Sequence, residues 1–120
     1  MSSFKAKCIL LDTNTQECTE VIVKSSQDIV DMLGGSSVSQ INIDKYHKVF
    51  YNPSEENYNK GVSGWVYLKE ELNEDIGVWV STEGKDYFVG DKILLVLCND
   101  TKPIDMTDTA KEFIMSCISI

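Results

Sequence analysis

The sequence predicts an α+β fold built on a mainly antiparallel, strongly twisted sheet of about six to seven strands. Short runs of alternating or continuous apolar residues recur along the chain, separated by Gly, Asn and Asp, as is typical of strands. Two further segments, 25–33 and 107–118, repeat apolar residues at helical spacing. Because there is no internal repeat or linker, we expect residues 1–120 to form a single globular domain.

The first half of the chain begins with a predicted hairpin, formed by strands over 5–12 and 17–24. A short helix should follow the second strand, because Ser25 with Asp28 three residues later is a helix-start signal. Gly34 and Gly35 supply its stop. Strands are expected over 37–43 and 49–51, and residues 52–61 are expected to form a long irregular loop.

In the second half, Trp65 and Tyr67 lie in a predicted strand over 62–68, and the acidic stretch 69–77 is expected to be a helical turn or a loop. A strand over 78–80 should turn at 82–84 into a strand over 85–89, and a second turn at Gly90 and Asp91 should lead into 93–98. The run 93–98 is apolar on both faces, which predicts a central strand.

The chain should end in an amphipathic helix packed on one face of the sheet. After a loop over 99–105, Thr107 or Asp108 can cap a helix. Its apolar residues recur at i, i+3, i+4, i+7 and i+8, at Ala110, Phe113, Ile114, Cys117 and Ile118.

The composition lacks arginine, contains one histidine, His47, and carries a net charge of −8. The bidentate guanidinium clamp for phosphate or carboxylate is therefore missing, and histidine acid–base chemistry has one candidate. An acidic surface also disfavours direct nucleic-acid binding, which depends on neutralising phosphates. His47 is expected to be exposed in a turn, with no nucleophile motif beside it. These features predict a protein that is not an enzyme and holds no cofactor.

The cysteines indicate a reducing compartment. Four are scattered along the chain without a CxxC pair or zinc-ligand spacing, so we expect free thiols and no metal site. No apolar run reaches the ~20 residues that cross a bilayer, and the first 20 residues do not resemble a signal peptide. We therefore expect a cytoplasmic protein that does not bind membranes.

Four large rings have two interpretations. Trp65, Tyr67, Trp79 and Tyr87 could form an exposed patch that stacks on a ligand or a partner. The interpretation favoured by the sequence is that these rings fill the core beneath the terminal helix, because aromatic side chains dominate cores.

The acidic residues Glu70, Glu71, Glu74 and Asp75 are most simply a solvated charged turn. A site for a divalent cation would need hard oxygen ligands at defined spacing, and no EF-hand pattern is present. A pair of carboxylates acting as a hydrolase depends on a separation in space that the sequence does not give.

The order of elements resembles a small uncharacterised domain family found in phages, other viruses and bacteria. The matching segments are the strands 8–12 and 21–23, the Gly34-Gly35 stop, the segment 89–96 and the helix start at 106–108. Residues 52–75 are longer and more acidic than this pattern. The resemblance implies no activity, only an accessory protein of a virus or mobile element.

The leading functional hypothesis is a small acidic, non-catalytic accessory protein that binds a protein partner. The candidate surfaces are the 52–61 loop with Tyr58, the acidic 70–75 segment, and any exposed face of Trp65 or Trp79. Edge strands also make a homodimer possible. One alternative is a domain that sequesters a nucleotide or metabolite in an aromatic pocket, with Lys45, Lys48 and Lys60 as point charges. A second alternative is a carboxylate-dependent hydrolase.

Overall fold

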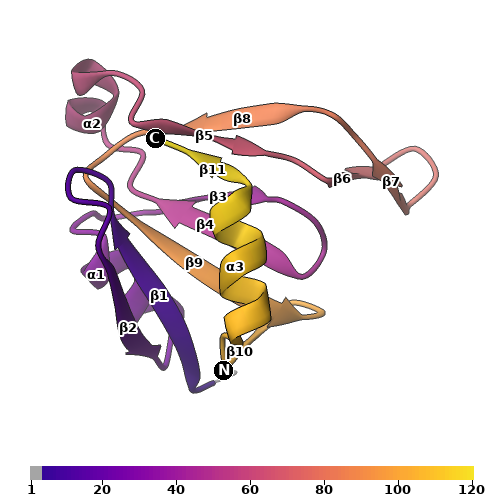
Figure 1. Cartoon of the computed structure of the whole chain (residues 1–120), viewed down its shortest axis with the longest axis horizontal. Coiled ribbons are helices and arrows are strands. Elements are labelled where there is room, and N and C mark those ends of the chain that lie inside the picture. Colours follow the sequence, from indigo (N-terminus) through magenta and orange to yellow (C-terminus); the bar gives the residue numbers. More distant parts are fainter. Residues whose placement is uncertain (1–3) are drawn as a thin grey trace.

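A computed structural model describes residues 4–120, which form an α+β fold of three short helices and eleven strands (Figure 1). Every paired strand is antiparallel, as the sequence predicted. The prediction of one sheet with about six to seven strands was wrong. The strands form sheets of six, three and two strands, because the second half of the chain pairs mostly with itself.

The six-stranded sheet has the order β2-β1-β9-β4-β3, with β10 also paired to β9. Its members are β1 (Ala6–Asp12), β2 (Cys18–Val23), β3 (Ser39–Asn42), β4 (His47–Tyr51), β9 (Lys92–Asn99) and β10 (Lys102–Ile104). The predicted hairpin of β1 and β2 is confirmed, and so is the central position of β9. Strand β10 was predicted to be loop; it follows a tight turn in which Asp100 adopts a positive φ of 56°.

Strand β9 is apolar on both faces because each face supports a separate core. Ile93 and Leu95 belong to the core beneath α3 (Asp108–Ser116). Leu94 and Val96 belong to the core beneath α1 (Ser26–Met32). Since adjacent strand residues point to opposite faces, the alternation assigns each side chain to one core.

Local signals set the ends of both predicted helices. The Ser25 hydroxyl accepts a hydrogen bond from the Asp28 amide at 3.2 Å, and Gly34 ends α1 with a φ of +71°. The Thr107 hydroxyl accepts from the Ala110 amide at 3.0 Å and begins α3. These contacts satisfy amide donors that the first helical turn leaves unpaired.

Helix α3 covers one face of the six-stranded sheet and leads into a strand that was not predicted. Ala110, Ile114 and Cys117 are buried, which confirms the predicted apolar face. Beyond the helix, β11 (Ile118–Ser119) pairs with β5 (Gly64–Tyr67). The C-terminus therefore lies beside the three-stranded sheet β11-β5-β8 (Figure 1).

Two predicted hairpin turns were wrong. Strand β8 (Lys85–Phe88) pairs with β5, whereas β6 (Glu70–Asn73) pairs with β7 (Val78–Ser81). The segment 82–84 is therefore a break within one long ribbon, where the Thr82 amide bonds to the Lys69 carbonyl. The Gly90-Asp91 turn leads from β8 into a different sheet, so β8 and β9 do not pair. The ribbon reverses at 74–77, where Gly77 has a φ of +67°.

Residues 52–61 were predicted to be irregular, and this prediction was also wrong. They contain α2 (Glu55–Lys60), which Ser54 caps by accepting a hydrogen bond from the Asn57 amide at 3.2 Å. Glu55 and Glu56 lie in its first turn, where the positive end of the helix dipole stabilises their negative charge. The Ser-Glu-Glu-Asn sequence was therefore a start signal, hidden by the lack of an apolar repeat.

Candidate functional site

The outer side of the three-stranded sheet carries an exposed group of rings. Trp65 and Tyr67 are two residues apart on β5 and are 37% and 44% exposed. Tyr87 lies directly opposite Trp65 on β8, with ring centroids 5.9 Å apart. The prediction that these rings fill the core beneath α3 was wrong. Val66 and Phe88 occupy the inner side of this sheet, so the intervening residues face outward.

Helix α2 adds Tyr58 to these rings. Its ring lies edge-on to Tyr87, with centroids 6.5 Å apart, and its hydroxyl is 3.3 Å from that of Tyr51. The ammonium of Lys85 lies 4.6 Å from the centre of the Trp65 ring, a cation–π geometry. We name Tyr58, Trp65, Tyr67, Lys85 and Tyr87 the aromatic face. The sequence analysis did not name Lys85. Because Lys85 and Tyr87 are two residues apart on one strand, they share a face, and this spacing could have identified Lys85.

The second exposed feature is the two-stranded ribbon β6–β7, which we name the arm. Figure 1 shows the arm extending from the end of the three-stranded sheet, away from the body of the molecule. Its base is held where the amides of Lys69 and Glu70 both lie 2.9 Å from the Ile43 carbonyl. Beyond that base, four large aliphatic side chains are 37–65% exposed: Leu72, Ile76, Val78 and Val80.

The arm is acidic as well as apolar. Residues 70–84 contain five carboxylates and no lysine, in a chain with eleven lysines. Glu74 and Asp75 occupy the exposed reversal of the arm, while Glu70 and Glu71 alternate across β6. The acidic residues named by the sequence therefore spread over the arm rather than converge on one point. Within residues 4–120, no group of three or more His, Cys, Asp or Glu side chains is placed to hold a metal ion.

Trp79 lies apart from the aromatic face. It is opposite Leu72 on the arm and only half-buried. Together with Tyr46, Lys48 and Asp100 it lines a hollow of about 360 Å³ between the arm and the six-stranded sheet. Nearby at the arm's base, the Glu70 Oε2 atom is buried without a hydrogen-bond partner among the described residues. The four predicted rings thus divide between two places.

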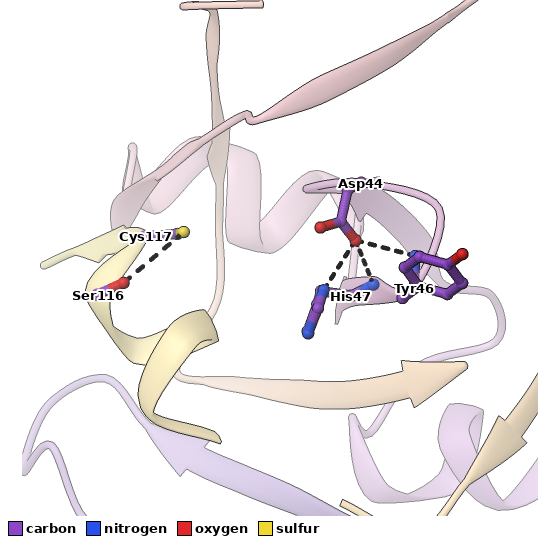
Figure 2. A network of polar contacts seen from close by, with 5 residues as sticks. All are labelled: Asp44, Tyr46, His47, Ser116 and Cys117. Carbon is purple, nitrogen blue, oxygen red and sulfur yellow. Dashed lines mark hydrogen bonds and ion pairs between the residues drawn. The ribbon is translucent and has the colours of Figure 1, made fainter. Parts of the chain in front are cut away.

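His47 was predicted to be exposed, and this prediction was wrong. Its side chain is 17% exposed, because the ring packs against Phe113 of α3 with centroids 4.5 Å apart. Figure 2 shows Asp44 at the centre of the surrounding contacts. One Asp44 carboxylate oxygen lies 2.8 Å from His47 Nδ1 and accepts from the amides of Tyr46 and His47. This arrangement fixes the turn before β4.

Among residues 4–120, no serine hydroxyl or cysteine thiol is hydrogen-bonded to this His–Asp pair. The serine hydroxyl and the thiol drawn in Figure 2, those of Ser116 and Cys117, contact each other and form a group separate from the His47–Asp44 pair. The Ser116 hydroxyl also donates to the Phe113 carbonyl at 2.6 Å, which occupies its proton within the helix. Covalent catalysis needs a nucleophile in hydrogen-bond contact with a base. Neither Ser116 nor Cys117 makes such a contact with His47.

The four cysteines are free in the structure, and three are buried. Burial raises the pKa of the Cys8 thiol to about 12, and Cys98 and Asp105 add smaller contributions in the same direction. Burial also raises the pKa of Cys98. The thiolate is the reactive form, so these two residues are structural.

Two of the three lysines proposed as ligand charges lie at one hollow. Lys45 lies over the Tyr46 ring at 5.4 Å, and Lys60 pairs with Glu56 at 3.7 Å within α2. Lys45 and Lys48 both line the hollow beside Tyr46 and Trp79, and Lys48 also lines a second hollow. The structure thus brings two of the three predicted lysines together with the Trp79 ring, whereas Lys60 lies on α2.

No protein-family model, curated protein or solved structure matches this chain. The resemblance to a domain family of phages, other viruses and bacteria accordingly stays a prediction. Among the helices of residues 4–120, none combines the length and the apolar character needed to cross a bilayer.

Proposed function

We propose that this chain is a small, non-catalytic accessory protein of the cytoplasm that binds a basic protein partner through its arm. One observation carries the proposal: four large aliphatic side chains are exposed on a segment, 70–84, that contains five carboxylates and no lysine. Exposed apolar residues on a projecting element are typical of interaction sites. An isolated two-stranded ribbon is also marginally stable in water, so a partner would stabilise it.

The charge of the arm favours a partner with Lys or Arg around an apolar groove. Electrostatic complementarity selects partners and accelerates encounter. An anionic membrane surface and a nucleic acid would both repel the arm, because each presents negative charge. A second copy would bring acidic arms together, and each copy carries a charge of −8.

The aromatic face is continuous with the surface of the arm, because β5 leads into β6 and β7 leads into β8. Tyr and Trp supply large, rigid contact areas and are enriched among residues that dominate binding energy. Strand addition at the free side of β8 is disfavoured, because the Asp86 carboxylate already accepts from the Tyr87 amide at 2.8 Å. We therefore propose contact through side chains rather than through an added strand.

The test begins with a photo-crosslinking amino acid placed at Ile76 on the arm, in cells that naturally express the protein. The matched control places it at Ile22, an aliphatic residue of β2 that is 47% exposed. A protein crosslinked only from position 76 is then purified, and its affinity is measured in solution. Ile76→Ser should weaken binding by about tenfold, whereas Ile22→Ser should leave the affinity unchanged.

The second part of the test removes charge from the β6–β7 ribbon. Glu74→Gln with Asp75→Asn should weaken binding by about threefold to tenfold, and added salt should reduce wild-type affinity. Glu17→Gln with Glu112→Gln removes the same charge from exposed sites elsewhere and should change little. Equal crosslinking from positions 22 and 76, or an unchanged affinity in all arm variants, contradicts the proposal. Self-association that Ile76→Ser abolishes would identify a second copy as the partner and would also overturn it.

A further inference from the structure

A groove remains on the face of the six-stranded sheet that α1 covers in part. Alternation along β4 places Lys48 and Phe50 on this face, opposite to Val49 and Tyr51. Helix α1 is only seven residues long and buries Ile29 against the sheet. The uncovered area next to it forms a hollow of about 430 Å³. This volume lies within the range of ~300–1,000 Å³ found for small-ligand sites.

The groove has an apolar floor and neutral polar edges. Phe50 and Cys98 lie on neighbouring strands below it, and Ile29, Val38 and Pro103 are among its apolar walls. Ser26, Gln40 and Thr101 add hydrogen-bonding groups without charge. Small-ligand sites combine these features: a mainly apolar lining with a few polar groups that fix orientation.

The charge of the groove is opposite to that of the protein. Among the described residues that line it, Lys48 and Lys102 are the only ionisable side chains apart from Cys98, and none carries a carboxylate. The whole chain carries nineteen Asp and Glu residues against eleven lysines, so a wholly cationic lining departs from the surface at large. A positive, partly apolar hollow in an acidic protein attracts small anions and focuses their approach.

Neither lysine is neutralised by the residues that the structure describes. Lys7 and Lys60 each have a carboxylate at 3.7 Å, but Lys48 and Lys102 have no ion pair. Lys48 is half-buried, and its positive charge opposes the rise that burial causes in the pKa of Cys98. The positive charge of Lys48 thus acts at the floor of the groove, where it would attract a bound anion.

We propose that this groove binds a small organic anion with a planar apolar body, which packs against Phe50 while its anionic group lies between Lys48 and Lys102. A lysine ammonium is a point charge and does not select between carboxylate and phosphate. The ligand class is therefore an aromatic or similarly flat acid. The groove shares Lys48 and Thr101 with the hollow beside Trp79, but none of the arm's four exposed aliphatic residues lines it, and the proposal does not depend on the protein partner.

The test uses naphthoate, naphthyl phosphate and the neutral naphthyl methanol as probes, followed by amide NMR spectra of the intact chain. Both anions, or one of them, should shift the amides of Gln40, Lys48, Phe50 and Thr101 and should bind about tenfold more tightly than the alcohol. A difference between the two anions identifies the preferred group. Equal affinity for all three probes, no binding at all, or shifts centred on Trp65 and Tyr87 would overturn the proposal.

Charge variants make the test specific. Lys48→Gln and Lys102→Gln should each weaken anion binding by about threefold to tenfold and leave binding of the neutral alcohol unchanged. Lys111→Gln makes the same change on α3, which covers the opposite face of the sheet, and should have no effect. Lys102 is exposed on β10, so its variant should fold even if Lys48→Gln lowers stability. Unchanged anion affinity in both groove variants would contradict the site.

Discussion

The hydroxyls of Tyr51 and Tyr58 lie 3.3 Å apart and connect the core strand β4 to helix α2. Tyr51 is 8% exposed, whereas Tyr58 is 42% exposed and lies against the ring of Tyr87. The pair therefore joins the interior of the protein to its aromatic face. Because α2 has no buried residue, this hydrogen bond is one of the few contacts that fix it.

The pH dependence of stability should report this pair. Burial, and then the hydrogen bond to Tyr58, raises the pKa of Tyr51 to about 12, from about 10 when unfolded. The folded state holds the proton more tightly, so the stabilisation is complete below about pH 10 and is lost as pH rises toward 12. Tyr51→Phe should flatten the fall in the free energy of unfolding above about pH 10, measured by urea denaturation. Tyr46→Phe, at an exposed ring, should keep the wild-type slope; identical slopes in both variants would refute this assignment.

Thiol reactivity should separate one cysteine from the other three. Cys18 is exposed, whereas Cys8, Cys98 and Cys117 are at most 3% exposed. A disulfide reagent should therefore modify one thiol rapidly in the native protein and all four after denaturation. Cys18→Ser should remove the rapid phase. A rapid phase that survives this substitution would show that a buried thiol is accessible.

Gly64 should tolerate a methyl group much less well than Gly77. An added Cβ at Gly64 would lie 2.5 Å from Phe88 Cζ and 2.7 Å from the Ser119 carbonyl oxygen. Gly64→Ala should therefore lower the free energy of unfolding by about 2–3 kcal/mol, through overpacking between β5, β8 and β11. Gly77→Ala meets open space and costs about 1 kcal/mol through its positive φ. Urea denaturation of both variants checks the order, and equal losses would contradict it.

The cap of α3 should contribute measurably to stability. Thr107→Ala removes the oxygen that accepts from the Ala110 amide and should cost about 1 kcal/mol. Thr109→Ala makes the same chemical change at an exposed position inside the helix, where alanine is favoured, and should be neutral or stabilising. Thermal unfolding distinguishes the two, and a Thr107→Ala variant as stable as Thr109→Ala would exclude the cap as a stabilising contact.

The candidate surface was predictable in its residues but not in its layout. Tyr58, Trp65 and Tyr67 were named from the sequence and gather on one face, yet the core was the favoured place for the two β5 rings. The alternation along β5 separates Trp65 and Tyr67 from Val66, but it does not predict which of the two faces is buried. That choice was made by Val66 and Phe88 together with Gly64, which lets Phe88 and the end of β11 approach closely.

The sequence by itself determined the features that depend on neighbouring residues: the β1–β2 hairpin, the ends of α1 and α3, and the apolar run of β9. Side-chain caps, glycines with positive φ and apolar periodicity act over a few residues, so they can be read locally. Only the tertiary structure decided that β8 pairs with β5, that β6 and β7 extend as an arm, and that a cationic groove remains beside α1. Main-chain pairing is indifferent to side-chain identity, so each strand's partner follows from which faces the whole chain can bury together.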